Sequence, residues 1–162
     1  MALVKVIIGS KSDLGKIEGL FRTLKELEID YELILTSAHR SPERTYKIAK
    51  SLGDKGVIIV ACGKSAHLPG VIASLTDLPV LGIPISSGVL DGLDALLSMS
   101  QMPKKVPVAV MSFDEDGAVN SALFAARILA LSDNGLKKRL KKYIEDLEKQ
   151  VEKEAGEIIG NQ

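Results

Sequence analysis

The chain is poor in the residues that crosslink proteins, bind metals or stack on bases. Of its 162 residues, one is cysteine, two are histidine and none is tryptophan, and aromatic residues make up 4%. A single cysteine excludes an internal disulfide and suits a cytoplasmic protein. The histidines, the cysteine and the scattered carboxylates show no metal-ligand spacing, so we expect no metal site. The scarcity of aromatic side chains argues against a surface that stacks nucleic-acid bases.

An excess of charge of one sign and a long hydrophobic run are also absent. Lys and Arg together number 21, as do Asp and Glu, so the formal net charge is zero. A neutral chain lacks the basic field on which nucleic-acid binding relies. No apolar run reaches the ~18 residues of a membrane-spanning helix, and residues 1–5 lead directly into a predicted strand, so we expect neither membrane association nor a signal peptide. A protein without net charge near pH 7 is also a candidate oligomer.

What the chain does have is an alternation of apolar runs and helical patterns. Hydrophobic residues make up 46% of it, which suffices for a substantial core in one domain of this length. Apolar runs predict strands at 4–8, 31–36, 57–62, 80–83 and 108–111. Helical spacing predicts helices that begin after Asp13 and at Ser41, and others at 68–75, 91–100 and 117–131. We therefore expect an α/β fold whose parallel sheet is covered on both faces.

Residues 134–159 differ from the rest of the chain. They are charged and carry apolar residues at i, i+3/i+4 and i+7, which predicts one long amphipathic helix. Such a helix either packs on its own domain or docks on a neighbouring subunit, and its narrow apolar stripe does not decide between them. With no internal repeat or interdomain linker, we expect a single domain over 1–162, with an α/β core at 1–132 and a C-terminal helix and tail at 133–162.

Both histidines follow predicted strands. His39 stands in the segment 37–42 (SAHRSP) and His67 in the segment 63–70 (GKSAHLPG). Ligands of open α/β sheets bind beyond the carboxyl ends of the strands, and histidine is well suited to moving protons near neutral pH. One such histidine is more often a solvated loop residue, but two at strand ends favour an active site. His39 is a candidate general acid/base, and Arg40 suits phosphate or carboxylate recognition unless it pairs with an acidic neighbour.

The other strand-end segments offer groups for an anionic, hydroxylated ligand. In residues 9–13 (GSKSD), a glycine turn is followed by serine hydroxyls that can bind a phosphate. Asp13 in the same segment can accept hydrogen bonds from ribose hydroxyls. Ser12 and Asp13 are equally suited to capping a helix. Residues 63–70 shape a tight turn into a helix start that can hold a carboxylate or CO2. Lys64 either attracts that anion or faces solvent, and Cys62 is expected to be a small buried residue. Residues 86–88 are placed to line the same edge, and 101–103 and 114–117 are expected to be structural loops.

Together these motifs resemble a known family. Residues 9–13, 37–42, 66–70 and 101–103 are similar, in order and with compatible spacing, to signature segments of class I N5-carboxyaminoimidazole ribonucleotide mutases of purine (IMP) biosynthesis. The resemblance spans about 4–131 and implies a flavodoxin-like three-layer sandwich that is usually assembled as a homo-octamer. It implies an isomerase that converts N5-carboxyaminoimidazole ribonucleotide to 4-carboxy-5-aminoimidazole ribonucleotide without metal or organic cofactor.

The resemblance also assigns roles to residues. It implies that His39 donates and accepts the protons while the carboxylate moves from the exocyclic nitrogen to the ring carbon. It places the nucleotide at the first two motifs and the migrating carboxylate at the third. The implied substrate-binding residues are Ser10, Ser12, Asp13, Ser37, Arg40, Gly63, Lys64, Ser65, Ala66, His67 and Leu68.

Two segments depart from the family pattern. Most of these mutases read Gly-Gly-Ala-Ala-His-Leu-Pro-Gly where this chain has Lys64 and Ser65. A basic residue followed by Ser is similar to class II relatives, which are 5-aminoimidazole ribonucleotide carboxylases that use CO2 directly, although those lack His-Leu-Pro-Gly. The mutase is thus the main prediction and the carboxylase the alternative. Further on, Lys104 and Lys105 replace a segment that usually has glycine before the next apolar residue, so the turn there is expected to differ.

Two other classes of function stay open. A flavodoxin-like module that binds a mononucleotide without catalysis would sandwich a flavin ring between aromatic side chains, and the strand-end loops contain little besides Phe113. A structural protein built around the C-terminal helix would leave the two histidine segments unexplained.

Overall fold

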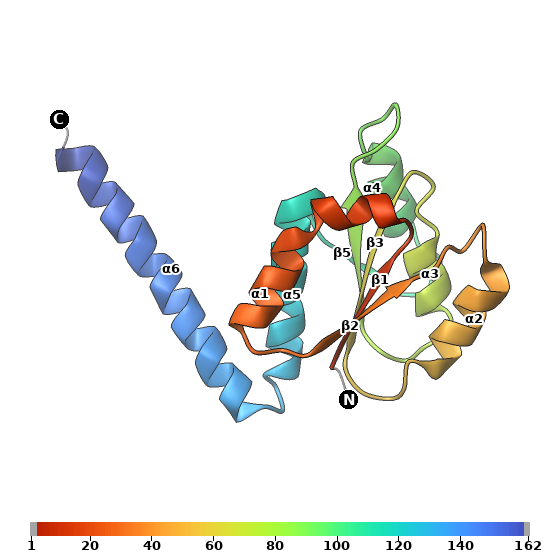
Figure 1. The fold of residues 1–162 in the computed structure, drawn as a ribbon, viewed down its shortest axis with the longest axis horizontal. Coiled ribbons are helices and arrows are strands. Elements are labelled where there is room, and N and C mark those ends of the chain that lie inside the picture. Colours follow the sequence, from red (N-terminus) through yellow and green to blue (C-terminus); the bar gives the residue numbers. More distant parts are fainter. Residues whose placement is uncertain (1–2, 161–162) are drawn as a thin grey trace.

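Five parallel strands form one central sheet in the computed structural model, which describes residues 3–160 (Figure 1). The strands are β1 (Val4–Ile8), β2 (Tyr31–Leu35), β3 (Val57–Gly63), β4 (Val80–Ile85) and β5 (Ala109–Val110). The helices are the 3-10 helix η1 (Lys11–Lys16) and α1 (Glu18–Glu26), α2 (Pro42–Ser51), α3 (Leu68–Ala73), α4 (Leu93–Ser100), α5 (Asp114–Leu129) and α6 (Asn134–Gly160). The order across the sheet, β2-β1-β3-β4-β5, is the flavodoxin-like order. The predicted fold class is therefore confirmed.

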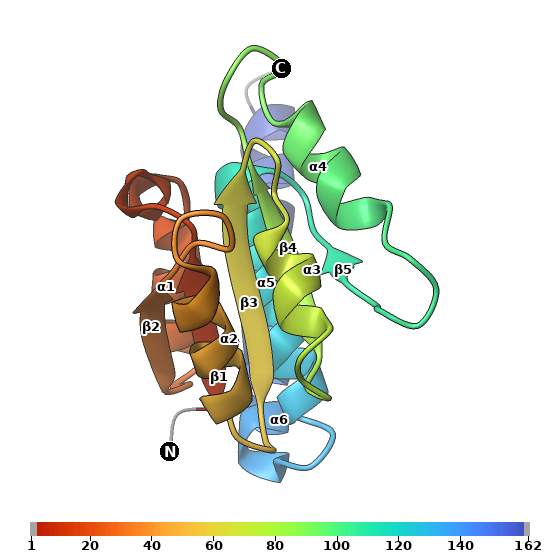
Figure 2. The same ribbon diagram turned by 90° about the vertical axis from the view of Figure 1, so that its right-hand side faces the viewer.

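Helices cover the two faces of the sheet as separate layers (Figures 1 and 2). The first core lies where α1 and α5 pack on one face of β1, β3 and β4. On the opposite face, α2 and α3 pack on alternate residues of the same strands, and α4 follows beside β4. Both β1 and β4 are buried along their whole length, which explains why their sequences are nearly continuous apolar runs.

All five predicted strands are present, although β4 runs to Ile85 rather than ending at residue 83. The two edge strands differ further from the expectation. At one edge, β5 is shorter than the predicted 108–111, because it pairs with β4 only through Leu81↔Ala109 and Gly82↔Val110. At the other edge, β2 is mostly exposed, and Leu33 and Leu35 are 44% and 49% accessible. Helices cover both faces of the sheet as expected, and β2 is exposed because an edge strand lies at the margin of the helical layers.

Three helix starts differ from the prediction. The helix α4 begins at Leu93 rather than at residue 91, because residues 88–92 form a turn. The segment after β1 begins as η1 rather than directly as an α-helix, and α1 follows it at Glu18. The last core helix, α5, begins at Asp114 rather than at Gly117, so the expected loop 114–117 is its first turn. That turn carries three acidic residues, which the positive end of the helix dipole favours. The buried alanines of α5 pack on the sheet as expected.

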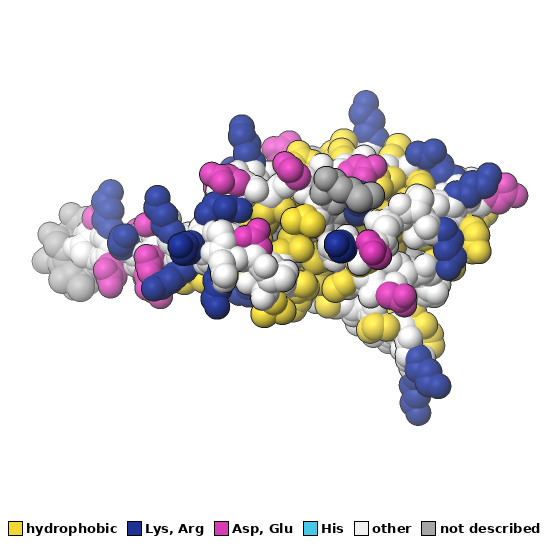
Figure 3. Space-filling view, turned by 90° about the horizontal axis from the view of Figure 1, so that it is seen from below, with side chains coloured by type: hydrophobic (Ala, Val, Ile, Leu, Met, Phe, Trp, Pro, Cys, Tyr) yellow, Lys and Arg dark blue, Asp and Glu magenta, His cyan; other side chains and the backbone are white. Residues whose placement is uncertain are grey.

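Only the beginning of α6 packs on its own domain. Leu136 and Leu140 are 2% and 7% exposed and join the core beneath α1 and α5. The rest of the helix projects away from the body of the molecule (Figure 1), and charged side chains cover much of it in the view from below (Figure 3). Leu147 and Val151 on this part are 44% and 65% exposed. Residues 161 and 162 of the predicted tail lie outside the described residues, as do residues 1 and 2 of the predicted entry into β1. Within 3–160, no helix is long and apolar enough to cross a bilayer.

Candidate active site

A pocket of about 520 Å³ lies at the carboxyl ends of β1, β2, β3 and β4. The neighbouring strands β1 and β3 mark the point where the connections of this fold diverge, which is where doubly wound sheets bind ligands. Its lining residues are Gly9, Ser10, Ser12, Asp13, Ser37, Ala38, His39, Arg40, Cys62, Gly63, Lys64, Ser65, Leu68 and Ser87.

The turn after β1 closes on itself through a capping box. The Ser10 N–H donates to Asp13 Oδ2 at 3.0 Å, and Ser10 Oγ accepts from the Ser12 N–H at 3.4 Å. The cap of η1 is therefore Ser10, whereas the sequence suggested Ser12 and Asp13, which lie inside the helix. The difference arises because the helix begins at Lys11, only two residues after the strand. Ser10, Ser12 and Asp13 nevertheless all line the pocket, so the residues that form the capping box are also accessible to a ligand.

The carboxyl group of Asp13 is buried beneath this turn. It is 7% exposed, and burial raises the pKa of Asp13 above its ordinary value of 3.8. The hydrogen bonds from Ser10 and Ser12 and the positive charges of Lys16 and Arg40 oppose that shift. The side chain thus presents a carboxyl group that is held in place by its neighbours and reaches the pocket.

The loop after β2 is tied to the loop after β1 by Arg40. Its Nη2 donates to the Gly9 carbonyl oxygen at 2.8 Å, and its Nε donates to Ser37 Oγ at 3.4 Å. The side chain is held by a backbone carbonyl and a hydroxyl group, rather than by the acidic neighbour that the sequence left open. Since Arg40 is exposed, part of its planar fork remains available to an anion in the pocket.

The two histidines meet at the mouth of the pocket. His39 Nε2 lies 2.8 Å from His67 Nδ1, and the two rings are arranged edge to face, with centroids 4.9 Å apart. A hydrogen bond between two imidazoles needs a proton on one of the facing nitrogens, so each ring constrains the tautomer of the other. The structure therefore brings the two strand-end histidines side by side, and their common role in one site stays a prediction.

The loop after β3 approaches the loop after β4 very closely. A Cβ on Gly63 would lie 2.4 Å from Ser87 Oγ, so a side chain at this position would displace Ser87. The next residue, Lys64, has φ of +57°, a backbone conformation that glycine adopts without strain. Its side chain is exposed and lines the pocket, so its position combines both alternatives of the sequence analysis.

The thiol at the end of β3 is part of the pocket wall. Cys62 is half-buried rather than fully buried as expected, because the strand ends at the pocket. Burial raises the pKa of Cys62 to about 11, with the negative charge of Asp13 as a second cause. At neutral pH the group is therefore a thiol, which is a poor nucleophile.

The structure brings together most of the predicted site residues. Ala66 is the exception, because it is 1% exposed and packs in the core with Ala95 and Met99. His67 reaches the site through His39 rather than through the pocket wall. The predicted residues that line the pocket are Ser10, Ser12, Asp13, Ser37, His39, Arg40, Gly63, Lys64, Ser65 and Leu68.

Sequence reasoning left other lining residues out of the predicted site. Ser87 follows β4, and this position was the available signal, since residues 86–88 were expected at the same edge. Gly9, Ala38 and Cys62 also line the pocket, next to predicted residues. Segment 101–103 lies elsewhere: Met102 packs near Gly70 on α3, where a Cβ on that glycine would lie 2.8 Å from Met102 Cε.

The arrangement suits a ligand with an anion, hydroxyl groups and a transferable proton. Arg40 and the serines offer donors, Asp13 offers an acceptor, and the two histidines offer an acid and a base. Within residues 3–160, no three His, Cys, Asp or Glu side chains gather into a group that would hold a metal ion.

Comparisons with known proteins agree on one family. The family model described as AIR carboxylase matches residues 3–150. N5-carboxyaminoimidazole ribonucleotide mutase of Pyrococcus horikoshii is 48% identical over 158 residues, covering 96% of this chain and 88% of the relative. The Bacillus subtilis protein of the same name is 40% identical over 159 residues, covering 97% and 98%. The crystal structure of Treponema denticola PurE superposes with a TM-score of 0.85 at 26% identity, covering 95% of this chain and 96% of that one.

The family model matches most of the chain, and the relatives match it along nearly their whole length. The fold agrees with this assignment, since the structure of Treponema denticola PurE shares its whole architecture. The chain therefore belongs to the AIR carboxylase family.

Proposed function

We propose that this chain is an N5-carboxyaminoimidazole ribonucleotide mutase, an isomerase of purine biosynthesis. The observation that carries the proposal is the His39–His67 pair at a pocket that also presents Arg40, Asp13 and serine hydroxyls. The substrate has a matching set of groups: a phosphate, ribose hydroxyls and a labile carboxylate on a ring that must exchange a proton. The relatives at 40–48% identity that bear the mutase name give the reaction.

The chemistry needs one proton given and one proton recovered. As the bond between the exocyclic nitrogen and the carboxylate breaks, CO2 is released and the nitrogen takes a proton. The ring carbon then bonds to the CO2 and loses its own proton. An imidazole that gives the first proton and takes the second ends the reaction as it began, so His39 serves as both acid and base. No oxidation or net loss of atoms occurs, and the reaction is an isomerisation.

Substrate binding divides among the strand-end loops. We assign the phosphate and ribose to Ser10, Ser12, Asp13, Ser37 and Arg40, which combine donors with one carboxyl acceptor. We assign the migrating carboxylate to the backbone of residues 63–68, since this segment lines the pocket and its His67 contacts His39. His67, 2.8 Å from His39, orients the catalytic ring and exchanges a proton with it.

The alternative is the carboxylase that uses CO2 directly. Lys64 is the residue that favours it, because an exposed ammonium group at the pocket would attract a bicarbonate or carboxylate anion. Against it stand the complete segment 66–70 (AHLPG) and the mutase name of the Pyrococcus horikoshii and Bacillus subtilis relatives. Binding of a flavin without catalysis is less well supported, because the residues that line the pocket include no Phe, Tyr or Trp.

We also propose that the chain works as a cytoplasmic homo-oligomer, with the octamer of the resemblance as the specific expectation. Two apolar surfaces support association. The exposed side chains of β2 include Leu33 and Leu35, and the projecting part of α6 exposes Leu147 and Val151. Surfaces of this kind are commonly buried against another subunit.

The two enzyme activities separate when each substrate is supplied alone. The purified protein is given N5-carboxyaminoimidazole ribonucleotide in one assay and 5-aminoimidazole ribonucleotide with CO2 in the other. Turnover of the first substrate at a much higher kcat/KM supports the mutase. The reverse order supports the carboxylase.

A further inference from the structure

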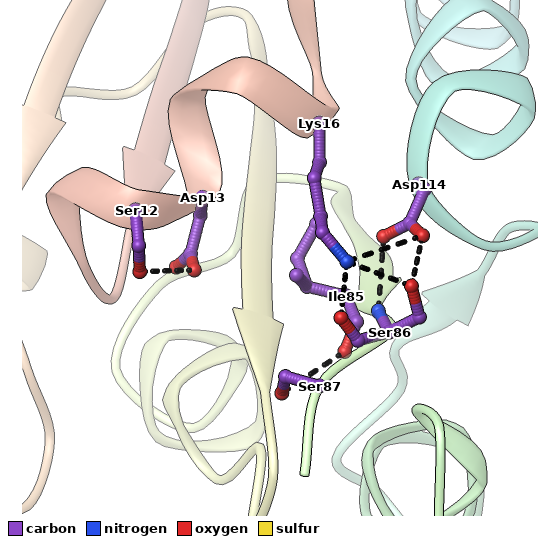
Figure 4. Close-up of polar contacts among 7 residues, drawn as sticks. All are labelled: Ser12, Asp13, Lys16, Ile85, Ser86, Ser87 and Asp114. Carbon is purple, nitrogen blue, oxygen red and sulfur yellow. Dashed lines mark hydrogen bonds and ion pairs between the residues drawn. The ribbon is translucent and has the colours of Figure 1, made fainter.

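The loop between β4 and α4, residues 86–92, is held at its first residue by two charged side chains from other elements (Figure 4). The Ser86 N–H donates to Asp114 Oδ1 at 2.9 Å, and the Ser86 hydroxyl donates to Asp114 Oδ2. Lys16 Nζ donates to Ser86 Oγ at 2.8 Å and to the Ser86 carbonyl oxygen. The N–H, the carbonyl and the hydroxyl of Ser86 are thus all held, and we call Lys16, Ser86 and Asp114 the loop clamp.

The loop clamp joins three elements that meet at the pocket. Lys16 is the last residue of η1, whose first turn contributes Ser12 and Asp13 to the pocket. Asp114 is the first residue of α5, and its φ of +45° lies in the left-handed region. Lys16 Nζ also lies 3.6 Å from Asp114 Oδ2, so the two charges that hold the loop attract one another. The clamp therefore links η1 and α5 through the loop residue between them.

Ser86 stands at the boundary between a fixed strand and an exposed loop. Before it, β4 is buried along its whole length. After it, Ser87 lines the pocket. Ser87 lies so close to Gly63 that a Cβ on Gly63 would be 2.4 Å from Ser87 Oγ. Beyond Ser87 the loop is exposed, and Val89 is fully accessible. The position of Ser87 is therefore determined largely by how Ser86 is held.

We propose that Lys16 and Asp114 are positioning residues, which keep Ser87 and the start of loop 86–92 in place against the pocket for substrate binding. This inference rests on the proposed function, because it assigns the clamp to the same site. The positive charge of Lys16 also acts on Asp13, where it opposes the rise in pKa that burial causes. Lys16 thus influences the pocket from two sides.

The test compares the clamp with a neighbouring ion pair that does not touch the loop. Lys16→Met removes the ammonium group, and Asp114→Gly removes the carboxylate while tolerating the positive φ. Arg22→Met and Glu115→Gln are the matched controls, because Arg22 Nη2 pairs with Glu115 Oε1 at 2.8 Å and likewise links α1 to α5. Lys16→Arg retains the charge and serves as the conservative variant.

Two readouts are measured on each full-length variant. Hydrogen exchange of peptides that cover 86–92 reports how firmly the loop is held. Steady-state kinetics with N5-carboxyaminoimidazole ribonucleotide separates KM from kcat, and the Kd for 5-aminoimidazole ribonucleotide is measured by calorimetry. We expect the two clamp variants to exchange about tenfold faster in the loop and to raise KM and Kd about tenfold, the effect of losing one charge-assisted hydrogen bond. Unfolding midpoints should match those of the controls, and Lys16→Arg should restore most of the binding.

The outcomes are distinct. Loop exchange equal to that of the controls, or unchanged KM and Kd in a loosened loop, would overturn the positioning role. A wild-type protein that binds 5-aminoimidazole ribonucleotide but does not turn over the carboxyamino substrate would overturn the proposed mutase instead, and the exchange rates with the Kd values would still decide on the clamp.

Discussion

The His39 ring donates to or accepts from the His67 ring at 2.8 Å, although 28 residues separate the two in the sequence. They meet because β2 and β3 flank β1 in a parallel sheet, so the loops that follow both strands open on the same edge. The contact occupies Nε2 of His39, so Nδ1 is the nitrogen of this ring that it leaves free for the substrate. In the proposed mutase, one of these imidazoles reacts and the other orients it.

Replacement of His39 should abolish turnover with little effect on folding. His39→Asn keeps a polar side chain of similar reach but removes the acid/base, and general acid/base catalysis contributes about 10²–10⁴-fold to rate. We expect kcat to fall by that factor and the Kd for 5-aminoimidazole ribonucleotide to change little. Pre-steady-state and steady-state rates, with circular dichroism for the fold, provide the measurement.

The matched variant is His67→Asn, which leaves His39 present but unoriented. It should lower kcat less than His39→Asn does, by about tenfold, because one orienting hydrogen bond is lost. Near-normal turnover in His39→Asn would remove this residue from the acid/base role.

The stability of the protein should depend on the ionisation of Asp13. Burial raises the folded-state pKa of this carboxyl above its ordinary value of 3.8. The folded state therefore holds the proton of Asp13 more tightly than the unfolded state does. The stabilisation that this gives to the folded protein is complete below pH 3.8 and is lost as the pH rises through the raised pKa. Over this window the free energy of unfolding of the wild type should fall relative to that of Asp13→Asn.

Urea denaturation of both proteins at fixed protomer concentration, in steps from about pH 3 to pH 7, measures this difference. A difference that is independent of pH would show that Asp13 is not shifted by burial. The opposite slope would show that its hydrogen bonds and the charges of Lys16 and Arg40 outweigh desolvation.

The lysine at position 64 should lower the free energy of unfolding relative to a glycine there, and it should not be required for mutase turnover. Its φ of +57° is unfavourable for a residue with a side chain, so Lys64→Gly should raise the free energy of unfolding by about 1 kcal/mol. The same reasoning applies to Lys105, whose φ of +76° also lies in the left-handed region. Lys105→Gly, far from the pocket, is the control for the stability effect.

Mutase kcat/KM in Lys64→Gly should stay within about threefold of the wild-type value, since an exposed lysine contributes modestly to binding a charged group. A selective loss of activity in Lys64→Gly, absent in Lys105→Gly, would contradict this and would make Lys64 part of the catalytic site.

The projecting part of α6 should hold subunits together. Leu147→Gln and Val151→Gln replace apolar side chains that are 44% and 65% exposed in one chain. If a partner subunit buries them, the double variant should lose mass in light scattering while keeping its circular dichroism spectrum. Truncation after residue 132 is a poorer test, because Leu136 and Leu140 belong to the core.

Lys149→Gln provides the comparison, since this side chain is 72% exposed on the same part of α6. An unchanged mass for the double apolar variant would place the subunit contacts elsewhere, with the exposed face of β2 as the next surface to change.

The sequence predicted those features that depend on local pattern. The buried strands β1, β3 and β4 are recognisable as apolar runs, and the strand-end rule predicts the proximity of His39 and His67 that the structure shows. Features that depend on tertiary contacts were missed. The exposure of β2 follows from its place at the sheet edge, and the loop clamp joins Lys16 to Ser86 across 70 residues. No local pattern marks such a partner.

The direct test of the mutase compares two substrates, in separate assays, on one preparation of the protein. N5-carboxyaminoimidazole ribonucleotide is supplied alone, and 5-aminoimidazole ribonucleotide is supplied with bicarbonate and carbonic anhydrase, with His39→Asn as the blank for both. We predict that formation of 4-carboxy-5-aminoimidazole ribonucleotide is fast from the first substrate and slow from the second. Efficient carboxylation of the second substrate with little turnover of the first would contradict the proposed function and would make Lys64 and Ser65 the residues to exchange next.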